Sequence, residues 1–391
     1  MGNCRLRAVT ERPTALRRGP GTRRRCLFQT VRTIHAQPEA DRHHGRSGTE
    51  AMIRVRQILS VCSELFLVPV GCFGQQSLLK PAGPQAGKIE WLYWTIFWIA
   101  FVVYVLVIMA FTRASTRNRI SGDRPAPVLE NPPGERGAFI AVHSALLITI
   151  FTLFVVLVMS IVTGAKVGGI SSKNPVTIQI TGHQWWWEVT YPNSQADQTV
   201  ITANEIHVPV GTPVVVLTSS ADVIHSFWAP NINGKRDLLP GYQNAVWMQV
   251  DKPGIYRGQC AEFCGYQHAH MGFEIVAQST EEFSKWLEQQ RKPAEPPRDP
   301  DAAQGLQVFM SHACVMCHTI RGTDAGSRMG PDLTHIASRH MIAAETLPNT
   351  RGALAGWIVD PQSTKPGSQM AANPLPPDDL NALIAYLQSL Q

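Results

Sequence analysis

CAEFCGYQHAHM, residues 260–271, is the stretch that decides how the middle of this 391-residue chain folds. Two thiols, an imidazole and a thioether within it form a soft ligand set, which favours copper over magnesium or calcium. A further imidazole, His225, lies upstream in the stretch DVIHSFW. If the two thiolates bridge two copper ions, His225 and His268 supply one imidazole each. Met271 and the backbone carbonyl of Glu262 then remain as weak axial ligands.

Other interpretations of these residues are open. Cys260 and Cys264 could form a disulfide in an oxidising compartment, and His225 could be a core histidine with its hydrogen bonds satisfied. Zinc also accepts cysteine and histidine, but the added thioether favours copper. A mononuclear blue-copper site needs only one cysteine, so the second thiol indicates a binuclear centre.

The spacing of His225 to Cys260 and the pattern C-x-E-x-C-x3-H-x2-M resemble the CuA domain of cytochrome c oxidase subunit II. The resemblance implies a binuclear copper centre that has two bridging cysteines, with the remaining donors completing the site: Cys260, Cys264, His225, His268, Met271 and the Glu262 carbonyl. It also implies that the Glu262 side chain reaches a magnesium or manganese ion at the contact with subunit I.

The length of the chain indicates two or three domains, and its charge distribution argues against nucleic-acid binding by the folded part. The net charge is +6, but residues 1–51 hold 11 Arg and 4 acidic residues, which leaves 24 basic against 25 acidic residues in the remainder. The folded part therefore offers no basic nucleic-acid-binding face. The basic leader 1–51 is either a disordered arm or is not translated, with synthesis starting at Met52.

Residues 52–72 are typical of a secretory signal. Two arginines precede the apolar run Ile58 to Val70, and Gly71-Cys72 follows it. This junction resembles a bacterial lipoprotein cleavage site, at which Cys72 becomes the lipidated N-terminus. Plain signal cleavage is the alternative.

Residues 73–170 contain two apolar segments that predict a transmembrane hairpin, one from about 89 to 111 and one from about 138 to 162. Each exceeds the ~20 residues that cross a bilayer. The arginine-rich loop between them is cytoplasmic by the positive-inside rule. We therefore expect a protein of the bacterial inner (plasma) membrane with everything after Val162 on the periplasmic, outer face.

Two ionisable residues near the second segment are functional candidates. His143 lies inside it, where an ionisable side chain is expensive, and an interfacial or interhelical hydrogen bond is the alternative to a functional role. In the family that this chain resembles, a glutamate near the start of this helix feeds a proton channel of subunit I. Glu135 is the nearest candidate.

The sequence of residues 171–280 predicts an all-β domain. Short β-branched runs at 176–180, 199–202, 212–217, 245–250 and 273–276 are separated by Gly, Pro and Asn, which predicts a β-sandwich or barrel. The resemblance implies a cupredoxin-like fold. The motif GHQWWW at 182–187 is the second family signature, whose aromatic cluster marks the surface that receives electrons, and we expect Trp185 to be the receiving residue. Adjacent residues of a strand alternate faces, so at least one of the three tryptophans belongs to the core.

Residues 281–300 predict a short amphipathic helix, Glu281 to Arg291, followed by a proline-rich linker. This semi-rigid spacer of roughly 25 Å marks a domain boundary before residues 301–391.

The C-terminal stretch CVMCH, residues 314–318, is a c-type haem attachment motif. Cys314 and Cys317, three apart on a helix, can form thioethers to the haem, and His318 is placed as an axial ligand of the iron. A thioredoxin-like Cys-x-x-Cys would need a βαβ context. Met329, Met341 and Met370 are the downstream candidates for the second axial ligand. Met370 is preferred because its position resembles that of the ligand in small all-α class I cytochromes c; an unliganded core methionine is the alternative.

From Met52 onward the chain resembles subunit II of a caa-type cytochrome c oxidase. That resemblance implies an electron-input subunit that accepts electrons at a covalently bound haem c and passes them to CuA and then to haem a of subunit I. There oxygen is reduced to water with proton translocation. The expected partners are subunit I, other subunits such as subunit III, the membrane, and an upstream cytochrome c or cytochrome bc complex. The alternatives are the electron-input subunit of a CuA-type nitric oxide reductase and a membrane-anchored electron carrier.

Overall fold

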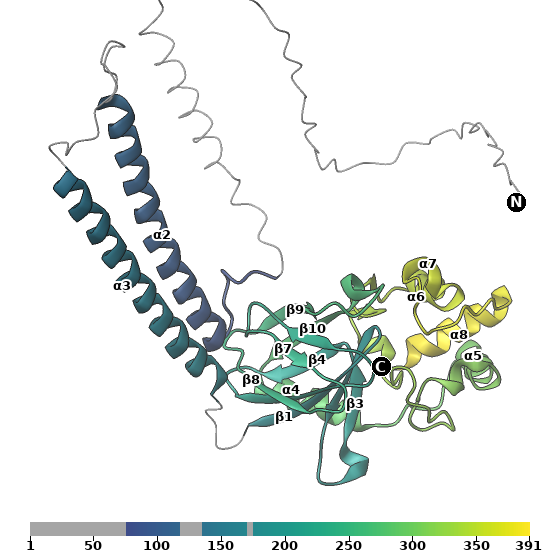
Figure 1. Ribbon diagram of the computed structural model, residues 1–391. Coiled ribbons are helices and arrows are strands. Elements are labelled where there is room, and N and C mark those ends of the chain that lie inside the picture. Colours follow the sequence, from purple (N-terminus) through teal and green to yellow (C-terminus); the bar gives the residue numbers. More distant parts are fainter. Residues whose placement is uncertain (1–75, 118–134, 170–174) are drawn as a thin grey trace, which may run out of the picture. The chain divides into compact units, whose positions relative to one another are not determined.

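A computed structural model describes residues 76–117, 135–169 and 175–391 (Figure 1). The predicted leader 1–51, the predicted signal 52–72 with Cys72, and most of the predicted cytoplasmic loop lie outside these residues. So does the side chain of Glu135.

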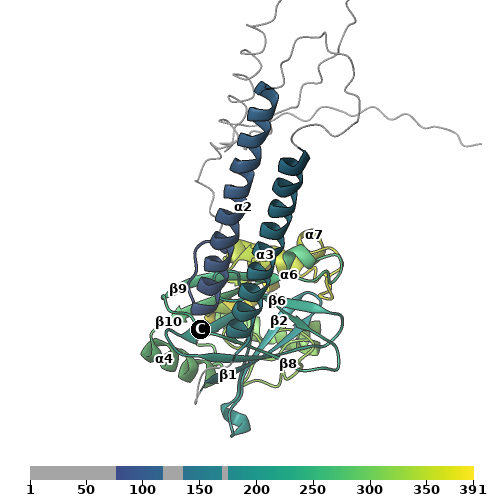
Figure 2. The same ribbon diagram turned by 60° about the vertical axis from the view of Figure 1, so that its left-hand side comes forward.

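The predicted membrane hairpin is present as α2 (Pro84–Arg117) and α3 (Glu135–Gly168). The two helices run side by side in both views (Figures 1 and 2). Each has 34 residues and so extends beyond the segment predicted from hydropathy, because backbone hydrogen bonding continues past the apolar part. At ~1.5 Å per residue each helix is about 51 Å long, against a hydrocarbon core of ~30 Å. The hairpin can therefore cross a bilayer with its ends outside the hydrocarbon.

Large apolar side chains cover the outside of both helices, such as Phe111 at 67% exposed and Phe151 at 69%. A surface of this kind is suited to lipid or to partner helices. His143 is exposed in the second helix, and its Nδ1 lies 2.8 Å from the carbonyl of Phe139 one turn earlier. This hydrogen bond therefore stays within the helix that carries His143.

The middle domain is a sandwich of two five-stranded sheets, in the strand orders β3-β2-β1-β5-β8 and β4-β10-β9-β6-β7. This confirms the predicted cupredoxin-like β-sandwich. The strands are β1 (Val176–His183), β2 (Trp186–Tyr191), β3 (Val200–Ala203), β4 (Glu205–Pro209), β5 (Val214–Ser220), β6 (His225–Trp228), β7 (Arg236–Leu238), β8 (Asn244–Met248), β9 (Gly254–Cys260) and β10 (Gly272–Gln278).

Alternation of buried and partly exposed residues places the sandwich core. Along β1 the pattern buries Ile178 and Ile180, and on β2 Trp187 is fully buried. The Trp187 ring meets that of Phe273 edge-on at 5.4 Å. Large apolar rings from the two facing sheets thus fill the space between them.

Two further elements of the sandwich are short 3-10 helices, η1 (Ala196–Gln198) and η2 (His268–His270). Helix α4 (Thr280–Arg291) follows β10 and starts at a capping box formed by Ser279 and Glu282. Its Trp286 packs edge-on against Tyr191 at 5.2 Å. The helix predicted for residues 281–291 is thus confirmed and is docked on the sandwich.

The C-terminal domain is helical, as predicted. Its elements are α5 (Pro300–Ser311), η3 (Ala313–Met316), η4 (Ile336–Ser338), β11 (Met341–Ile342), β12 (Leu347–Pro348), α6 (Arg351–Val359), α7 (Pro361–Thr364) and α8 (Pro377–Ser389). Helices α5 and α8 cross closely at Gly305, where an added Cβ would lie 2.0 Å from the carbonyl oxygen of Ala382. Phe309 and Tyr386 are buried beside this crossing.

The proline-rich segment before α5 is hydrogen-bonded to the C-terminal domain. The Ala294 amide donates to the carbonyl of Arg321 at 2.8 Å, and the Arg321 guanidinium donates to the carbonyl of Arg291 at 3.1 Å. His335 contacts the carbonyl of Lys292 at 3.1 Å. The end of α4 and the start of the segment, at Ala294, therefore lie against that domain, while most of the segment is exposed.

Candidate functional site

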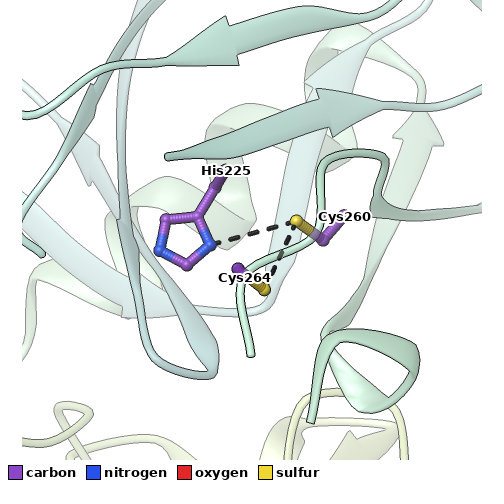
Figure 3. Close-up of side chains that lie close together, drawn as sticks. All are labelled: His225, Cys260 and Cys264. Atoms are coloured by element: carbon purple, nitrogen blue, oxygen red, sulfur yellow. Dashed lines mark hydrogen bonds between the residues drawn. The ribbon is translucent and has the colours of Figure 1, made fainter. Parts of the chain in front are cut away.

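The first candidate site lies where two neighbouring strands of one sheet meet. His225 begins β6 and Cys260 ends β9, and the pairing of Phe227 with Cys260 aligns the two strands. His225 Nδ1 lies 3.9 Å from Cys260 Sγ, and Cys260 Sγ lies 3.8 Å from Cys264 Sγ (Figure 3). All three residues are buried.

The loop after β9 brings the remaining predicted donors to the same place. Cys264 Sγ is 3.6 Å from Nδ1 of His268 and 3.8 Å from Sδ of Met271. Cys260 Sγ is 3.2 Å from the Glu262 carbonyl oxygen. The structure thus gathers all six donors that the sequence predicted for a binuclear copper centre.

The distance between the two sulfurs bears on the disulfide alternative. A disulfide has an S–S length of about 2.05 Å, whereas Cys260 and Cys264 are free cysteines with sulfurs 3.8 Å apart. Two thiols, two imidazoles and a thioether in one cluster fit a soft metal. The arrangement of Cys260 and Cys264 therefore favours copper binding over a disulfide between them.

Electrostatics prepare one of the thiols for metal binding. The pKa of Cys260 is lowered to about 4, because the neighbouring Cys264 thiol hydrogen-bonds to it and outweighs the effect of burial. The pKa of Cys264 is raised for the same reason and by burial. Each thiol therefore shifts the pKa of the other in the opposite direction, and a cation bound between the sulfurs would favour the thiolate form of both.

Asp222 orients His225, and the sequence reasoning missed this role. His225 Nε2 lies 2.8 Å from Asp222 Oδ1, which leaves Nδ1 facing the sulfurs. Burial alone would lower the pKa of His225, but its contacts with Cys260 and Asp222 raise it. The only sequence signal was the position of an acidic residue three places before a candidate ligand.

A close approach of the backbone also fixes the ring of His225. A Cβ added to Gly182 on β1 would lie 2.7 Å from the ring Cδ2. Any larger residue at 182 would displace the imidazole.

Trp185 is placed differently from the expectation of a surface residue. It lies in the turn between β1 and β2 and is 8% exposed, and its indole Nε1 donates to the Cys264 carbonyl at 2.9 Å. Trp186 stacks on His183 at 4.3 Å, and Trp187 is fully buried. The expected core tryptophan is therefore Trp187, while Trp185 lies directly against the metal-ligand loop.

The second candidate site is the haem motif of the C-terminal domain. The helix expected there is the 3-10 helix η3, which includes Cys314 and ends just before Cys317. With ~3 residues per turn, a 3-10 helix aligns side chains three positions apart, so the tighter turn also keeps both thiols on one side. Both cysteines are free.

His318 is held in the form that an iron ligand requires. Its Nδ1 lies 2.8 Å from the Pro331 carbonyl, which leaves Nε2 for a metal. Burial lowers the pKa of His318, so the imidazole is neutral. The residues present thus fit a haem iron ligated by histidine.

Met370 lies in the loop between α7 and α8 and is half-buried. Its carbonyl accepts a hydrogen bond from Gln362 Nε2 at 3.1 Å. Of the other two candidates, Met329 is 70% exposed and Met341 is half-buried in β11. Met370 stays a prediction for the second axial ligand.

Comparisons with known proteins match both regions. Residues 193–280 match the family described as Cytochrome C oxidase subunit II, periplasmic domain, and residues 302–391 match the family described as Cytochrome c. The chain is 35% identical over 342 residues to cytochrome c oxidase subunit 2 of Alkalihalophilus pseudofirmus, covering 84% of this chain and 95% of the relative. It is 31% identical over 263 residues to cytochrome c oxidase subunit 2 of Bacillus sp. strain PS3, and this match covers 62% of this chain and 72% of the relative.

A solved structure of the periplasmic domain of subunit II of cytochrome oxidase from Bradyrhizobium japonicum is also similar. It is 33% identical, with a TM-score of 0.29, and the match covers 31% of this chain and 97% of that one.

Proposed function

The chain belongs to the cytochrome c oxidase subunit 2 family, and on this premise we propose that the six donors gathered around Cys260 and Cys264 hold its binuclear copper centre. Cys260 and Cys264 bridge the two ions. His225 and His268 supply one imidazole each, and Met271 and the Glu262 carbonyl are the weak ligands. The observation that carries the proposal is the meeting of all six donors around two buried thiols.

The chain is the electron-input subunit of a caa3-type haem-copper oxidase of the inner membrane, with its CuA and cytochrome c domains on the outer face. Electrons that arrive at the haem of the cytochrome domain pass to CuA and on to subunit I, which reduces oxygen to water. The two alternative functions, a subunit of a nitric oxide reductase and a membrane-anchored electron carrier, are not favoured, because the relatives described above are cytochrome c oxidase subunits.

The residues around the copper donors keep the site rigid, which suits electron transfer. Asp222 fixes the ring of His225 through Nε2. Trp185 anchors the ligand loop through the carbonyl of Cys264. A site whose ligands are held by neighbouring groups rearranges little when its charge changes.

In the C-terminal domain, we assign Cys314 and Cys317 as the thioether residues of a covalently bound haem. His318 and Met370 are its axial ligands, and this pairing raises the haem potential. The neutral, oriented imidazole of His318 supports the first half of this assignment.

Several partners and modifications also belong to this proposal. The exposed side chain of Glu262 reaches a magnesium or manganese ion at the contact with subunit I, beside the exposed rings of Phe263 and Tyr266. Subunit III and an upstream cytochrome c or cytochrome bc complex complete the electron path. Cys72 is proposed as a lipidated N-terminus, and the domains follow the boundaries given by the sequence.

Spectroscopy and metal analysis of the detergent-purified complex test the function. We expect two copper ions per chain at this site, a seven-line copper EPR signal, and c-type haem and haem a absorption in one sample. The c-type haem should stay with the polypeptide under denaturation, because thioethers are covalent. Absence of the copper signal would contradict the proposed centre, and b-type haem with non-haem iron in place of haem a would move the chain to nitric oxide reduction.

A further inference from the structure

Lys365 is the only lysine in residues 301–391, and it is buried, with 3% of its surface exposed. Its ammonium group donates to three backbone carbonyls, those of Trp185 at 2.9 Å, His270 at 2.9 Å and Ala343 at 3.2 Å. A lysine ammonium has three N–H donors, so each has one carbonyl partner. Burying a cation is costly unless its hydrogen bonds are satisfied in this way.

The three carbonyls come from both domains. Ala343 belongs to the cytochrome domain, as does Lys365 itself, whereas Trp185 and His270 belong to the copper domain. His270 lies between two of the proposed copper ligands, and the Trp185 indole is bonded to the Cys264 carbonyl. Lys365 is five residues before Met370. One side chain therefore joins the loop of the proposed haem ligand to the loop of the proposed copper ligands.

Neighbouring contacts lie along the same boundary between the two domains, which we call the seam and which is formed by residues 267–272 of the copper domain and 343–344 and 365–367 of the cytochrome domain. Gln267 Nε2 donates to the Pro366 carbonyl at 2.8 Å, and the Gly272 amide donates to the Ala344 carbonyl at 3.2 Å. A Cβ built on Gly367 would lie 3.8 Å from the indole of Trp185, so the backbone at 367 covers that ring. The indole is thus enclosed between the Cys264 carbonyl and the chain that leads to the haem-ligand loop.

Other polar contacts hold the two domains further along. The buried Arg339 donates to the Ala203 carbonyl of the sandwich at 2.7 Å and to the Asp332 carbonyl of its own domain at 3.1 Å. Arg328 forms an ion pair with Glu188 at 3.0 Å. Arg339 and Arg328 contact strands of the sandwich away from residues 260–271. The contacts of Lys365, Gln267 and Gly272 lie at that loop, and among these residues Lys365 bonds to the most carbonyls.

We infer that Lys365 is a positioning residue for electron transfer within this chain, fixing residues 366–370 against Trp185 so that the haem and copper sites face each other in one arrangement. The inference rests on the proposed function of both sites. In the step that Lys365 would serve, one electron would pass from a haem held by Cys314, Cys317 and His318 to copper held by Cys260 and Cys264, which oxidises the donor and reduces the acceptor by one electron each. No bond is formed or broken and no proton is transferred.

The test compares Lys365→Met, Lys365→Arg and the matched control Lys285→Met in the complete purified oxidase. Lys285 is exposed on α4, so its replacement removes a positive charge without touching the seam. The first readout is hydrogen–deuterium exchange of the backbone amides, which needs no turnover. Burial lowers the pKa of Lys365 to about 7, so the expected effect is taken from the hydrogen bonds and not from the charge. Three carbonyls lose their donor in Lys365→Met, which is worth a factor of at least about ten in the opening equilibrium.

We expect exchange in peptides covering 267–272 and 365–370 to become at least about tenfold faster in Lys365→Met. Peptides from β1 and α8 should be unchanged, which shows that both domains still fold. The second readout is the rate of electron transfer from haem to copper after rapid photoreduction, which should fall in Lys365→Met and recover at least partly in Lys365→Arg. Copper content and haem spectra should equal those of the wild type.

Wild-type exchange at the seam and an unchanged electron-transfer rate in Lys365→Met would overturn the inference. So would a Met variant that performs better than the Arg variant, because the role would then be packing. Absence of copper or of a c-type haem in the wild type itself would instead contradict the proposed function, so the two failures are distinguishable.

Discussion

Replacing Asp222 with asparagine should weaken copper binding without unfolding the domain. The Asp222 carboxylate accepts hydrogen bonds from the amides of Gln184 and Val223, each at 2.6 Å, and contacts His225 Nε2 at 2.8 Å. These bonds outweigh burial and hold the pKa of Asp222 below its usual value, so a full negative charge faces the imidazole. Asparagine lacks that charge, and its NH2 group must face one of the three donors.

The size of the effect follows from these contacts. A hydrogen bond to a charged group contributes about 1.5–3 kcal/mol, which corresponds to roughly 10- to 100-fold in metal affinity. His225 is fully buried, so water cannot replace the lost partner. The free energy of the lost hydrogen bond between Asp222 and His225 should therefore appear as weaker binding of copper.

Titration of the purified oxidase with a copper chelator measures this change. The copper EPR signal should be lost at roughly 10- to 100-fold lower chelator concentration in Asp222→Asn, while the haem spectrum of the same sample serves as an internal reference. Asp237→Asn, an exposed position on β7, is the matched control. Equal copper retention in the two variants would refute the argument that the carboxylate orients the ligand.

Three further predictions concern the rest of the chain. Gly305→Ala should destabilise the cytochrome domain by ~1–3 kcal/mol or more, because the added methyl would lie 2.0 Å from the Ala382 carbonyl oxygen. Gly356→Ala is the control, because nothing lies within 4 Å of a Cβ built there. Equal melting temperatures of the two variants would contradict the close crossing of α5 and α8. Burial and a neighbouring carboxylate raise the pKa of Glu345 to about 8, so the native state binds its proton more tightly than the unfolded state, and the free energy of unfolding should fall as pH rises from about 4.5 to about 8, by up to ~1.4 kcal/mol per pH unit. Glu345→Gln should flatten this fall in thermal melts, and an unchanged slope would count against the shift. Cleavage of an engineered protease site in residues 293–300 should make electron delivery dependent on protein concentration and salt, because the tether supplies a high effective concentration; turnover that is the same before and after cleavage would exclude that role.

The sequence was sufficient for features whose residues lie close together in the chain. Residues 260–271 supply five of the six proposed copper donors, and CVMCH supplies two proposed thioether cysteines and one proposed axial ligand of the haem, so a single loop or turn brings each set together. Hydropathy likewise identified both membrane helices, because a run of apolar residues is itself the physical requirement for crossing a bilayer. The helix ends were underestimated, since helical hydrogen bonding continues into polar sequence.

The strands were predicted less completely. The apolar runs indicated five of the ten strands, and the tryptophan motif was treated as part of a strand that is β2; β4, β6, β7 and β9 were missed. Among the missed strands, β6 and β9 carry proposed metal ligands in place of apolar residues, and β7 has only three residues. A pattern of alternating hydrophobicity is short or interrupted in such strands, so that pairing with neighbours decides them.

Contacts between distant residues were decided by the tertiary structure alone. Trp185 belongs to a tryptophan cluster that the sequence assigned to a surface, yet it is covered by a loop about 180 positions later, whose Lys365 binds its carbonyl. Asp222 could be seen beside His225, but only the folded chain showed which ring nitrogen it contacts. Local patterns report how a segment buries its apolar side chains, whereas the partner of a buried polar group is set by whichever distant segment packs against it.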